Sequence, residues 1–166
     1  GSREHRAAAR LMGDELIAAR EKMYLAATIQ FTMPGSPTIY YGDEAGVQGF
    51  EDPFNRRTYP WGNEDGSLLD FYRRLGGVRT HSSALTGGEL RFVRAKGGLL
   101  VYERWDEHER VFVIINRDAE ENVVRLPCHS VTDLMHTGGS TRTSAELGDL
   151  ALRIPGRTAR ILRADD

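Results

Sequence analysis

The chain has 166 residues, of which 40% are hydrophobic and 28% are charged, and its formal net charge is −2. These values are typical of a globular protein that is long enough to bury a hydrophobic core. They exclude a nonspecific nucleic-acid binder, which requires a basic stripe, and no stretch approaches the roughly 20 apolar residues of a membrane-spanning helix.

The cysteine and histidine residues do not indicate a disulfide or a metal site. Cys128 is the only cysteine, so the chain forms no internal disulfide and needs no oxidising compartment. We expect a cytoplasmic protein, with secretion as the alternative. The five histidines are scattered without metal-ligand spacing. We therefore expect neither a metal nor an organic cofactor.

The first part of the chain has helical character. Residues 3–12 are rich in Ala and Arg and are expected to be helical or frayed. Asp14 is suited to cap the start of a helix, and apolar residues at helical spacing over 14–31 predict a helix that is buried on more than one side. Pro34 then ends this helix, because proline cannot continue it.

A strand, a loop and a second helix are expected next. Residues 38–42 are β-branched and aromatic without polar alternation, which predicts a strand buried on both faces, as in a parallel sheet. Residues 43–66 are rich in Gly, Asp, Asn and Pro and predict a long loop of the kind that often carries function. Ser67 and Asp70 then predict the capped start of a helix whose buried stripe continues to Val78.

From about residue 89 the pattern changes to short apolar runs separated by turns. These runs cover residues 90–93, 99–102, 111–115, 123–126, 131–134, 150–154 and 159–162. Residues 96–98, 106–109 and 116–118 have the composition of hairpin turns. The pattern predicts an antiparallel β-sandwich. The expected fold class is therefore α+β, with one part over residues 1–82 and the sandwich over residues 83–166.

Two motifs resemble a known family. Residues 35–44, Gly-Ser-Pro-Thr-Ile-Tyr-Tyr-Gly-Asp-Glu, resemble the eighth strand of the (β/α)8 barrel in α-amylase-family glycoside hydrolases. Residues 52–57, Asp-Pro-Phe-Asn-Arg-Arg, resemble the loop that follows this strand in neopullulanase-, cyclomaltodextrinase- and oligoglucosidase-like members. Residues 68–79 resemble the last barrel helix. The resemblance is strong over residues 13–86 and architectural beyond them. It implies the end of the barrel followed by the C-terminal β-domain.

The resemblance also implies a reaction that this chain lacks the groups to perform. Family members cleave or transfer α-glucosidic linkages with retention, which requires a nucleophilic carboxylate and a carboxylic acid about 5 Å apart. In the family these groups lie on earlier strands, and one strand cannot close an eight-stranded barrel. We therefore expect a fragment of an α-glucan hydrolase or transglycosylase that has no catalytic residue and is inactive alone.

Three residues are candidates for binding an α-glucan oligosaccharide. The resemblance places Asp52 and Arg56 on the donor side of the cleft, where a carboxylate accepts from sugar hydroxyls and a guanidinium donates to them. The alternative is a salt bridge within the loop. Tyr41, like Tyr59 and Trp61, offers a flat ring for a pyranose face, with packing as the alternative.

Two further expectations concern other groups. Asp43 and Glu44 are adjacent and point in opposite directions at a strand end, so they cannot act on one atom; we expect one to anchor the loop and the other to be solvated. A second functional class is a self-standing carbohydrate-binding or assembly module, for which Tyr102 and Trp105 are the aromatic candidates. Apolar surface and unpaired strand edges at the barrel end also predict self-association.

Overall fold

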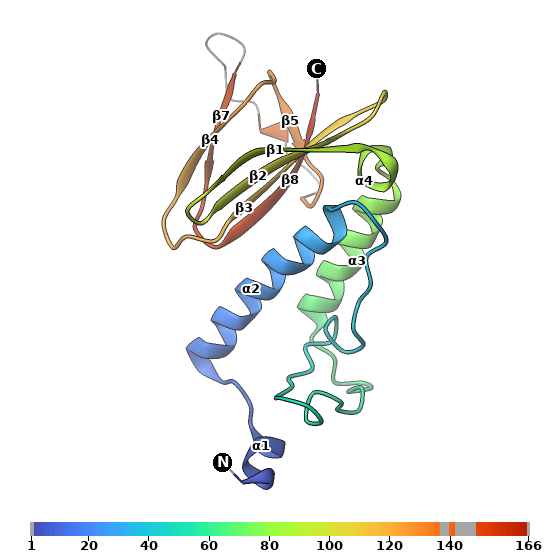
Figure 1. The fold of residues 1–166 in the computed structure, drawn as a ribbon, viewed down its shortest axis with the longest axis vertical. Coiled ribbons are helices and arrows are strands. Elements are labelled where there is room, and N and C mark those ends of the chain that lie inside the picture. Colours follow the sequence, from blue (N-terminus) through green and yellow to red (C-terminus); the bar gives the residue numbers. More distant parts are fainter. Residues whose placement is uncertain (1, 137–139, 142–148, 166) are drawn as a thin grey trace.

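The computed structural model describes residues 2–136, 140–141 and 149–165. Four helices come first: α1 (Arg3–Ala8), α2 (Gly13–Thr32), α3 (Gly66–Thr80) and α4 (Ser83–Gly87). The strands are β1 (Glu89–Lys96), β2 (Leu99–Trp105), β3 (Arg110–Asn116), β4 (Asn122–Leu126), β5 (Val131–Asp133), β6 (Ser140–Thr141), β7 (Leu150–Ile154) and β8 (Thr158–Ala164). The helices occupy one end and the strands the other (Figure 1). The predicted α+β class is confirmed.

The strands form two antiparallel sheets. One has the order β1-β2-β3-β8-β5-β6, and the other pairs β4 with β7. The seven predicted apolar runs correspond to β1–β5, β7 and β8, whereas the short β6 was not predicted. The hairpin predicted at 116–118 was wrong, because the chain there crosses from β3 in the large sheet to β4 in the small one.

The central strands of the large sheet are buried on both faces. Val101, Phe112 and Ile114 pack toward the β4–β7 sheet. Their neighbours Tyr102 and Val113 point to the other face and pack with the helices. Side chains alternate between faces along a strand, so β3 reads as a continuous apolar run because both faces are covered.

The C-terminal part of α2 and the short α4 contact the second face of the large sheet, and α3 packs against α2 and α4 (Figure 1). Their contribution to the core includes Phe31 and Tyr72, whose rings meet edge to face with centroids 5.9 Å apart. Leu75 and Ile161 belong to the same buried cluster. This cluster crosses the boundary predicted at residue 82, and the division into two domains stays a prediction.

Two buried arginines, Arg79 of α3 and Arg104 of β2, close the C-terminal end of α2; we call them the arginine clamp. Arg79 donates to the carbonyl oxygens of Phe31 (2.7 Å), Met33 (3.1 Å) and Gly35, and Arg104 donates to those of Thr32 (2.6 Å), Gly88 (2.9 Å) and Glu89 (3.1 Å). Burial lowers the pKa of both guanidinium groups. The clamp satisfies carbonyls that the helix end leaves unpaired, where a cation is favoured.

Two predicted helix starts were wrong in detail. The N-cap of α2 is Met12, which makes no side-chain cap, rather than Asp14. The N-cap of α3 is Asp65, whose carboxylate accepts from the backbone N–H groups of Ser67 (3.1 Å) and Leu68 (3.2 Å). A carboxylate two and three residues before these donors reaches them better than the hydroxyl of Ser67 does.

The strand predicted at residues 38–42 is not formed. Residues 36–40 have no regular structure, and a turn begins at Tyr41. The side chains of Ile39, Tyr40 and Tyr41 are 38%, 49% and 47% exposed. A parallel strand needs neighbours for its N–H and C=O groups, and none of the described strands pairs with this segment. The predicted loop is confirmed, since residues 43–65 contain no helix or strand.

Candidate functional site

A sharp turn at Gly42 directs the loop back toward α2. Gly42 has a φ of 93°, and a Cβ at this position would lie 2.8 Å from Cγ2 of Val47. The N–H of Val47 donates to the carbonyl of Gly42 at 2.9 Å, which closes the turn. Only glycine tolerates this backbone conformation and this close approach. The turn brings Asp43 and residues 46–50 next to α2.

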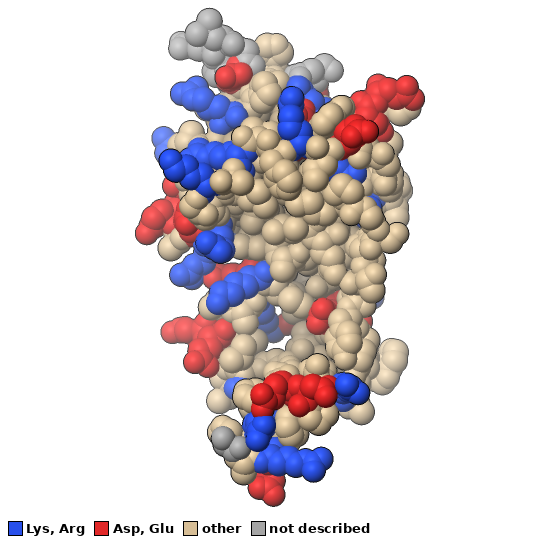
Figure 2. All heavy atoms as spheres, viewed as in Figure 1, with Lys and Arg blue, Asp and Glu red and all other residues tan. Residues whose placement is uncertain are grey.

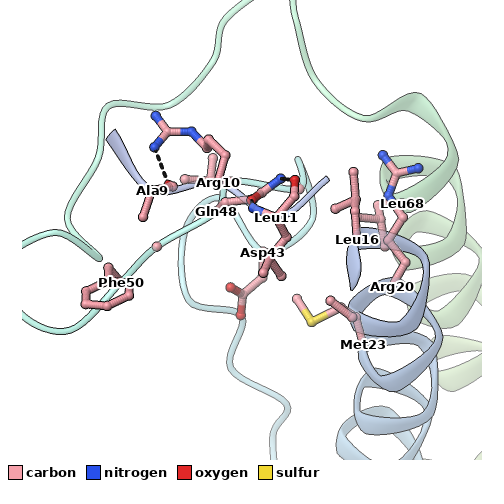
Figure 3. A pocket seen from close by; sticks show the side chains of 14 residues that line it. Ala9, Arg10, Leu11, Leu16, Arg20, Met23, Asp43, Gln48, Phe50 and Leu68 are labelled. Carbon is pink, nitrogen blue, oxygen red and sulfur yellow. Dashed lines mark hydrogen bonds between the residues drawn. The ribbon is translucent and has the colours of Figure 1, made fainter. Parts of the chain in front are cut away.

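Between α2 and this loop lies a cavity of about 280 Å³, which we call the helix–loop pocket (Figure 3). Its apolar lining comes from the segment before α2, from α2, from the loop and from α3: Leu11, Leu16, Ala19, Met23, Val47, Phe50 and Leu68. In Figure 3 the carboxylate of Asp43 lies between Phe50 and Met23. The pocket therefore combines an apolar wall with one acidic group.

Most polar groups around the helix–loop pocket are already engaged. The Gln48 amide accepts from the N–H of Leu11 at 2.6 Å and donates to its carbonyl at 3.3 Å. Arg10 donates to the carbonyl of Ala9 at 2.7 Å, and Arg20 forms an ion pair with Asp65. These contacts hold the segment before α2, helix α2 and the loop together, and they form the frame of the pocket.

Asp43 differs from these groups. Among the described residues, none gives its carboxylate a hydrogen bond or an ion pair. Burial raises the pKa of Asp43 above its ordinary value, and the negative charge of Glu44 raises it further. Desolvation and a like charge both disfavour the ionised form. A half-buried acid with a raised pKa in an apolar pocket is a common feature of binding sites.

The neighbouring Glu44 has a structural role. Its Oε2 accepts from the N–H of Gly42 at 3.0 Å. Burial raises the pKa of Tyr59, and the negative charges of Glu44 and Glu64 raise it further. Glu44 thus takes the role of loop anchor, whereas Asp43 faces the helix–loop pocket.

The candidate sugar-binding residues lie on exposed parts of the loop. Nε of Arg56 is 2.8 Å from Oδ1 of Asp52, and their side chains are 66% and 60% exposed. This is the loop salt bridge that we gave as the alternative. The hydroxyl of Tyr41 donates to the carbonyl of Arg57 at 3.0 Å. Trp61 is 79% exposed. None of these four side chains lines the helix–loop pocket.

The aromatic pair proposed for a sugar platform on the sandwich is not available. Tyr102 is fully buried and its hydroxyl is hydrogen-bonded to Oγ1 of Thr32. Burial raises the pKa of Tyr102 to about 12. Side chains alternate between the two faces of β2, and the Tyr102 ring lies on the face that packs against the helices. The prediction that Tyr102 is part of an exposed platform was therefore wrong. Trp105 is half-buried, with the guanidinium of Arg91 5.7 Å from its ring centroid.

Among the described residues, no group of three or more His, Cys, Asp or Glu side chains could hold a metal ion. None of the helices in the described part is long and apolar enough to cross a membrane. On the face shown in Figure 2, basic and acidic side chains are intermixed.

Comparisons with known proteins identify the relatives of this chain, although no family model matches it. It is 43% identical over 86 residues to an amylopullulanase of Thermoanaerobacterium thermosulfurigenes, which covers 52% of this chain and 5% of that protein. It is 34% identical over 110 residues to a cyclomaltodextrinase of a Bacillus species, which covers 64% of this chain and 20% of that protein. A solved α-amylase of Geobacillus thermoleovorans, in complex with acarbose, superposes with a TM-score of 0.77 and 27% identity over 88% of this chain and 33% of that chain.

These likenesses in sequence and fold agree with the motifs at residues 35–44 and 52–57. The chain belongs to the α-amylase family of glycoside hydrolases and corresponds to a C-terminal portion of such an enzyme. It spans at most a fifth of the length of these two relatives. The activity, the substrate and the partners of the whole protein are therefore matters for proposal.

Proposed function

We propose that this chain is part of a retaining α-glucan hydrolase or transglycosylase that acts in starch or maltodextrin metabolism in the cytoplasm. Helix α2, residues 38–42, the loop and α3 would form the end of its (β/α)8 barrel, and the sandwich would follow as its C-terminal domain. The sequence likeness to an amylopullulanase and a cyclomaltodextrinase is the observation that carries this proposal.

We infer that the two catalytic carboxyl groups lie in the rest of the parent enzyme. Retaining cleavage uses a nucleophilic carboxylate and an acid on opposite sides of the scissile bond. Asp43 and Glu44 do not suit these roles, since Glu44 is bound to the backbone of Gly42 and Asp43 faces the helix–loop pocket. We infer that this chain contributes substrate contacts rather than catalytic residues and is inactive alone.

Asp52, Arg56 and Tyr41 are the proposed contacts to the α-glucan. Asp52 and Arg56 are exposed and already paired at 2.8 Å. Together they present carboxylate acceptors and guanidinium donors to a sugar edge. The acarbose complex of the related α-amylase supports an oligosaccharide as the ligand of the parent. The alternative, a self-standing binding module, loses Tyr102 from its two aromatic candidates, Tyr102 and Trp105, since the Tyr102 ring is buried.

We also propose that the isolated chain self-associates. Eight of the eleven exposed large apolar side chains of the described residues lie before α2, on α2 and in the segment and loop that follow it: Leu11, Met12, Ile17, Ile39, Tyr40, Tyr41, Phe50 and Trp61. Residues 36–40 also leave backbone groups outside any sheet. A second copy could cover this surface and pair with this segment.

The proposed function is tested on the parent enzyme with a maltooligosaccharide. We expect cleavage in which the first product has the α-configuration, followed by proton NMR before mutarotation. Asp52→Asn and Arg56→Gln are expected to raise KM about tenfold or more, since each removes charge-assisted hydrogen bonds to the sugar. A β-configured product, or no cleavage, would overturn the proposal. Asp70→Asn, an exposed carboxylate paired with Arg73, is the control.

A further inference from the structure

A second cavity, of about 450 Å³, lies between the helices and the sandwich; we call it the helix–sheet pocket. The face of α2 that carries Leu16 and Met23 is turned toward the loop (Figure 3), whereas Leu25 and Thr28 line the helix–sheet pocket. Met23 and Leu25 are about 200° apart around the helix axis. The helix–sheet pocket therefore faces away from residues 38–50, and β8 and the segment after β5 form its opposite wall.

Much of the wall of the helix–sheet pocket is apolar and aromatic. It is formed by Tyr24, Leu25, Phe71, Met135, Ala159 and Ile161. The rings of Tyr24 and Phe71 meet edge to face with centroids 4.6 Å apart, and Thr28, Ser67 and Thr158 add hydroxyl groups to the lining. The volume lies within the 300–1,000 Å³ of typical small-molecule sites. Aromatic rings beside hydroxyl groups suit a sugar ring, which has apolar faces and a polar edge.

The charged side chains in this lining are mainly cationic. Arg74, Arg157 and Arg160 stand against one carboxylate, that of Asp70. The side chain of Asp70 is 68% exposed and is paired with Arg73 at 3.2 Å. Asp70 is thus engaged by an arginine from outside the lining and leaves the three lining arginines to other partners.

The three arginines differ in these partners. Arg157 is 3.1 Å from Glu21 of α2, and Arg160 is 3.7 Å from Asp133 of β5. Arg74 has no carboxylate partner among the described residues. The pocket therefore has an excess of positive charge, which an anionic ligand balances and a neutral oligosaccharide does not.

Arg74 also has hydrogen-bond donors to offer. Its Nη1 donates to the carbonyl of Met135 at 3.4 Å, a contact that directs the side chain from α3 toward the segment after β5. A guanidinium has five N–H donors, so most of them stay available to a ligand. A phosphate ester carries about −1.5 to −2 charges at pH 7 and three strong acceptor oxygens, and arginine binds phosphate through two parallel hydrogen bonds.

We propose that the helix–sheet pocket binds a phosphorylated monosaccharide, with Arg74 as the main contact to the phosphate and the rings of Tyr24 and Phe71 against the sugar. The phosphate follows from the charge of the lining, whereas the choice of a sugar as the body of the ligand rests on the proposed function. Asp52 and Arg56 do not line this pocket, so its ligand would bind apart from the proposed α-glucan contacts.

The test is a titration of the ¹⁵N-labelled 166-residue chain with glucose 6-phosphate, glucose and inorganic phosphate at pH 7. We expect glucose 6-phosphate to bind about tenfold more tightly than either of the others, because it alone uses both the cation and the aromatic wall. It should shift the amide signals of Leu25, Phe71 and Ile161.

Two variants locate the phosphate contact. Arg74→Gln is expected to weaken the binding of glucose 6-phosphate about tenfold or more, since it removes charge-assisted hydrogen bonds. Arg74 is exposed on α3, so this change is not expected to unfold the chain, and the amide spectrum of the free variant checks this. Arg153→Gln is the control, since Arg153 is 77% exposed on β7 and lies outside the lining; it should keep the affinity.

Four results would overturn the proposal. The three amide signals could stay unchanged at every concentration of glucose 6-phosphate. Inorganic phosphate could bind as tightly, which would make this a simple anion site, or glucose could, which would exclude recognition of the phosphate. An equal loss in both variants would show attraction by the overall charge alone. Tighter binding of adenosine monophosphate would replace the sugar by a nucleoside as the body of the ligand.

These outcomes are separate from the test of the proposed function. A parent enzyme that cleaves a maltooligosaccharide, beside a chain that does not bind glucose 6-phosphate, would contradict only the ligand of the helix–sheet pocket. Binding of glucose 6-phosphate beside a parent that does not cleave would contradict only the proposed function.

Discussion

Replacing Arg104 by methionine tests the role of the arginine clamp. Methionine fills much of the same volume but has no donor. The side chain of Arg104 is 1% exposed, and it donates to the carbonyls of Thr32, Gly88 and Glu89 at 2.6, 2.9 and 3.1 Å. These acceptors belong to the end of α2 and to the connection between α4 and β1. The substitution therefore removes one group that joins the helices to the sheet.

The expected loss of stability follows from these contacts. A buried acceptor left without its donor costs about 1–3 kcal/mol, so three acceptors cost about 3–9 kcal/mol. Removing a buried charge returns several kcal/mol of desolvation, and it also relieves the repulsion from Arg79 that helps to lower the pKa of Arg104. We expect a net loss of about 3–5 kcal/mol, the range found when one partner of a buried charged contact is deleted.

Urea unfolding followed by circular dichroism measures this loss. The midpoint should fall while the slope with denaturant stays the same, since the exposed area is unchanged. In a thermal scan the loss corresponds to a decrease of about 6–20 °C in Tm, at about 2–4 °C per kcal/mol for a chain of this size. The control is Arg153→Met, since Arg153 is 77% exposed in an ion pair with Glu121, and such a pair contributes less than about 1 kcal/mol. Equal stability of the two variants would refute the clamp argument.

Three further predictions concern the helical end. Burial and the charge of Glu44 raise the pKa of Asp43 above 3.8, so ionised Asp43 destabilises the fold. Asp43→Asn is therefore expected to be more stable than the unmodified chain at pH 7 and equally stable below pH 3.8, where Asp43 is protonated in both the folded and the unfolded state. A stability difference that persists in acid would contradict this. Asp52→Asn is expected to change the free energy of unfolding by less than about 1 kcal/mol, because its ion pair with Arg56 is exposed. A larger loss of stability in urea would show a structural role. Ile17→Glu places a charge at an apolar side chain that is 57% exposed. This variant is expected to have a lower mass by light scattering than the unmodified chain, closer to the 18.6 kDa of one chain. If the unmodified chain is already monomeric, self-association is contradicted.

The sandwich was predictable because its signals are local. Turn composition marks the ends of most strands, and each strand completes its hydrogen bonds with a neighbour inside the chain. The long helices were predictable for the same reason, since the apolar spacing and Pro34 are sufficient to define α2. Their exact caps were not, because the position of a cap depends on backbone geometry that the sequence does not specify: Met12 rather than Asp14 precedes α2, and Asp65 rather than Ser67 caps α3.

The segment 38–42 shows the limit of this reasoning. Its residues favour a buried strand, but a strand forms only with partners, and none of the described strands reaches it. The helix–loop pocket was missed for a related reason. Leu16 and Met23 meet Asp43 only because the chain turns after α2 and again at Gly42, and no spacing in the sequence links these positions.

The unengaged carboxylate of Asp43 could not be read from its neighbours in the chain. The sequence gives Asp43 and Glu44 equal standing as acids. The structure separates them, because Glu44 reaches the N–H of Gly42 and Asp43 does not find a donor among the described residues. The difference depends on the direction of two adjacent side chains after a glycine turn.

The most direct test of the central claim is hydrolysis of a chromogenic maltooligosaccharide by the purified 166-residue chain, with the full-length parent enzyme as the positive control. The account predicts no turnover by this chain beside an active parent, because the proposed function assigns the catalytic carboxylates to the rest of the parent. Turnover by the isolated chain that disappears with Asp43→Asn or Glu44→Gln would contradict it and would assign the chemistry to this pair of acids.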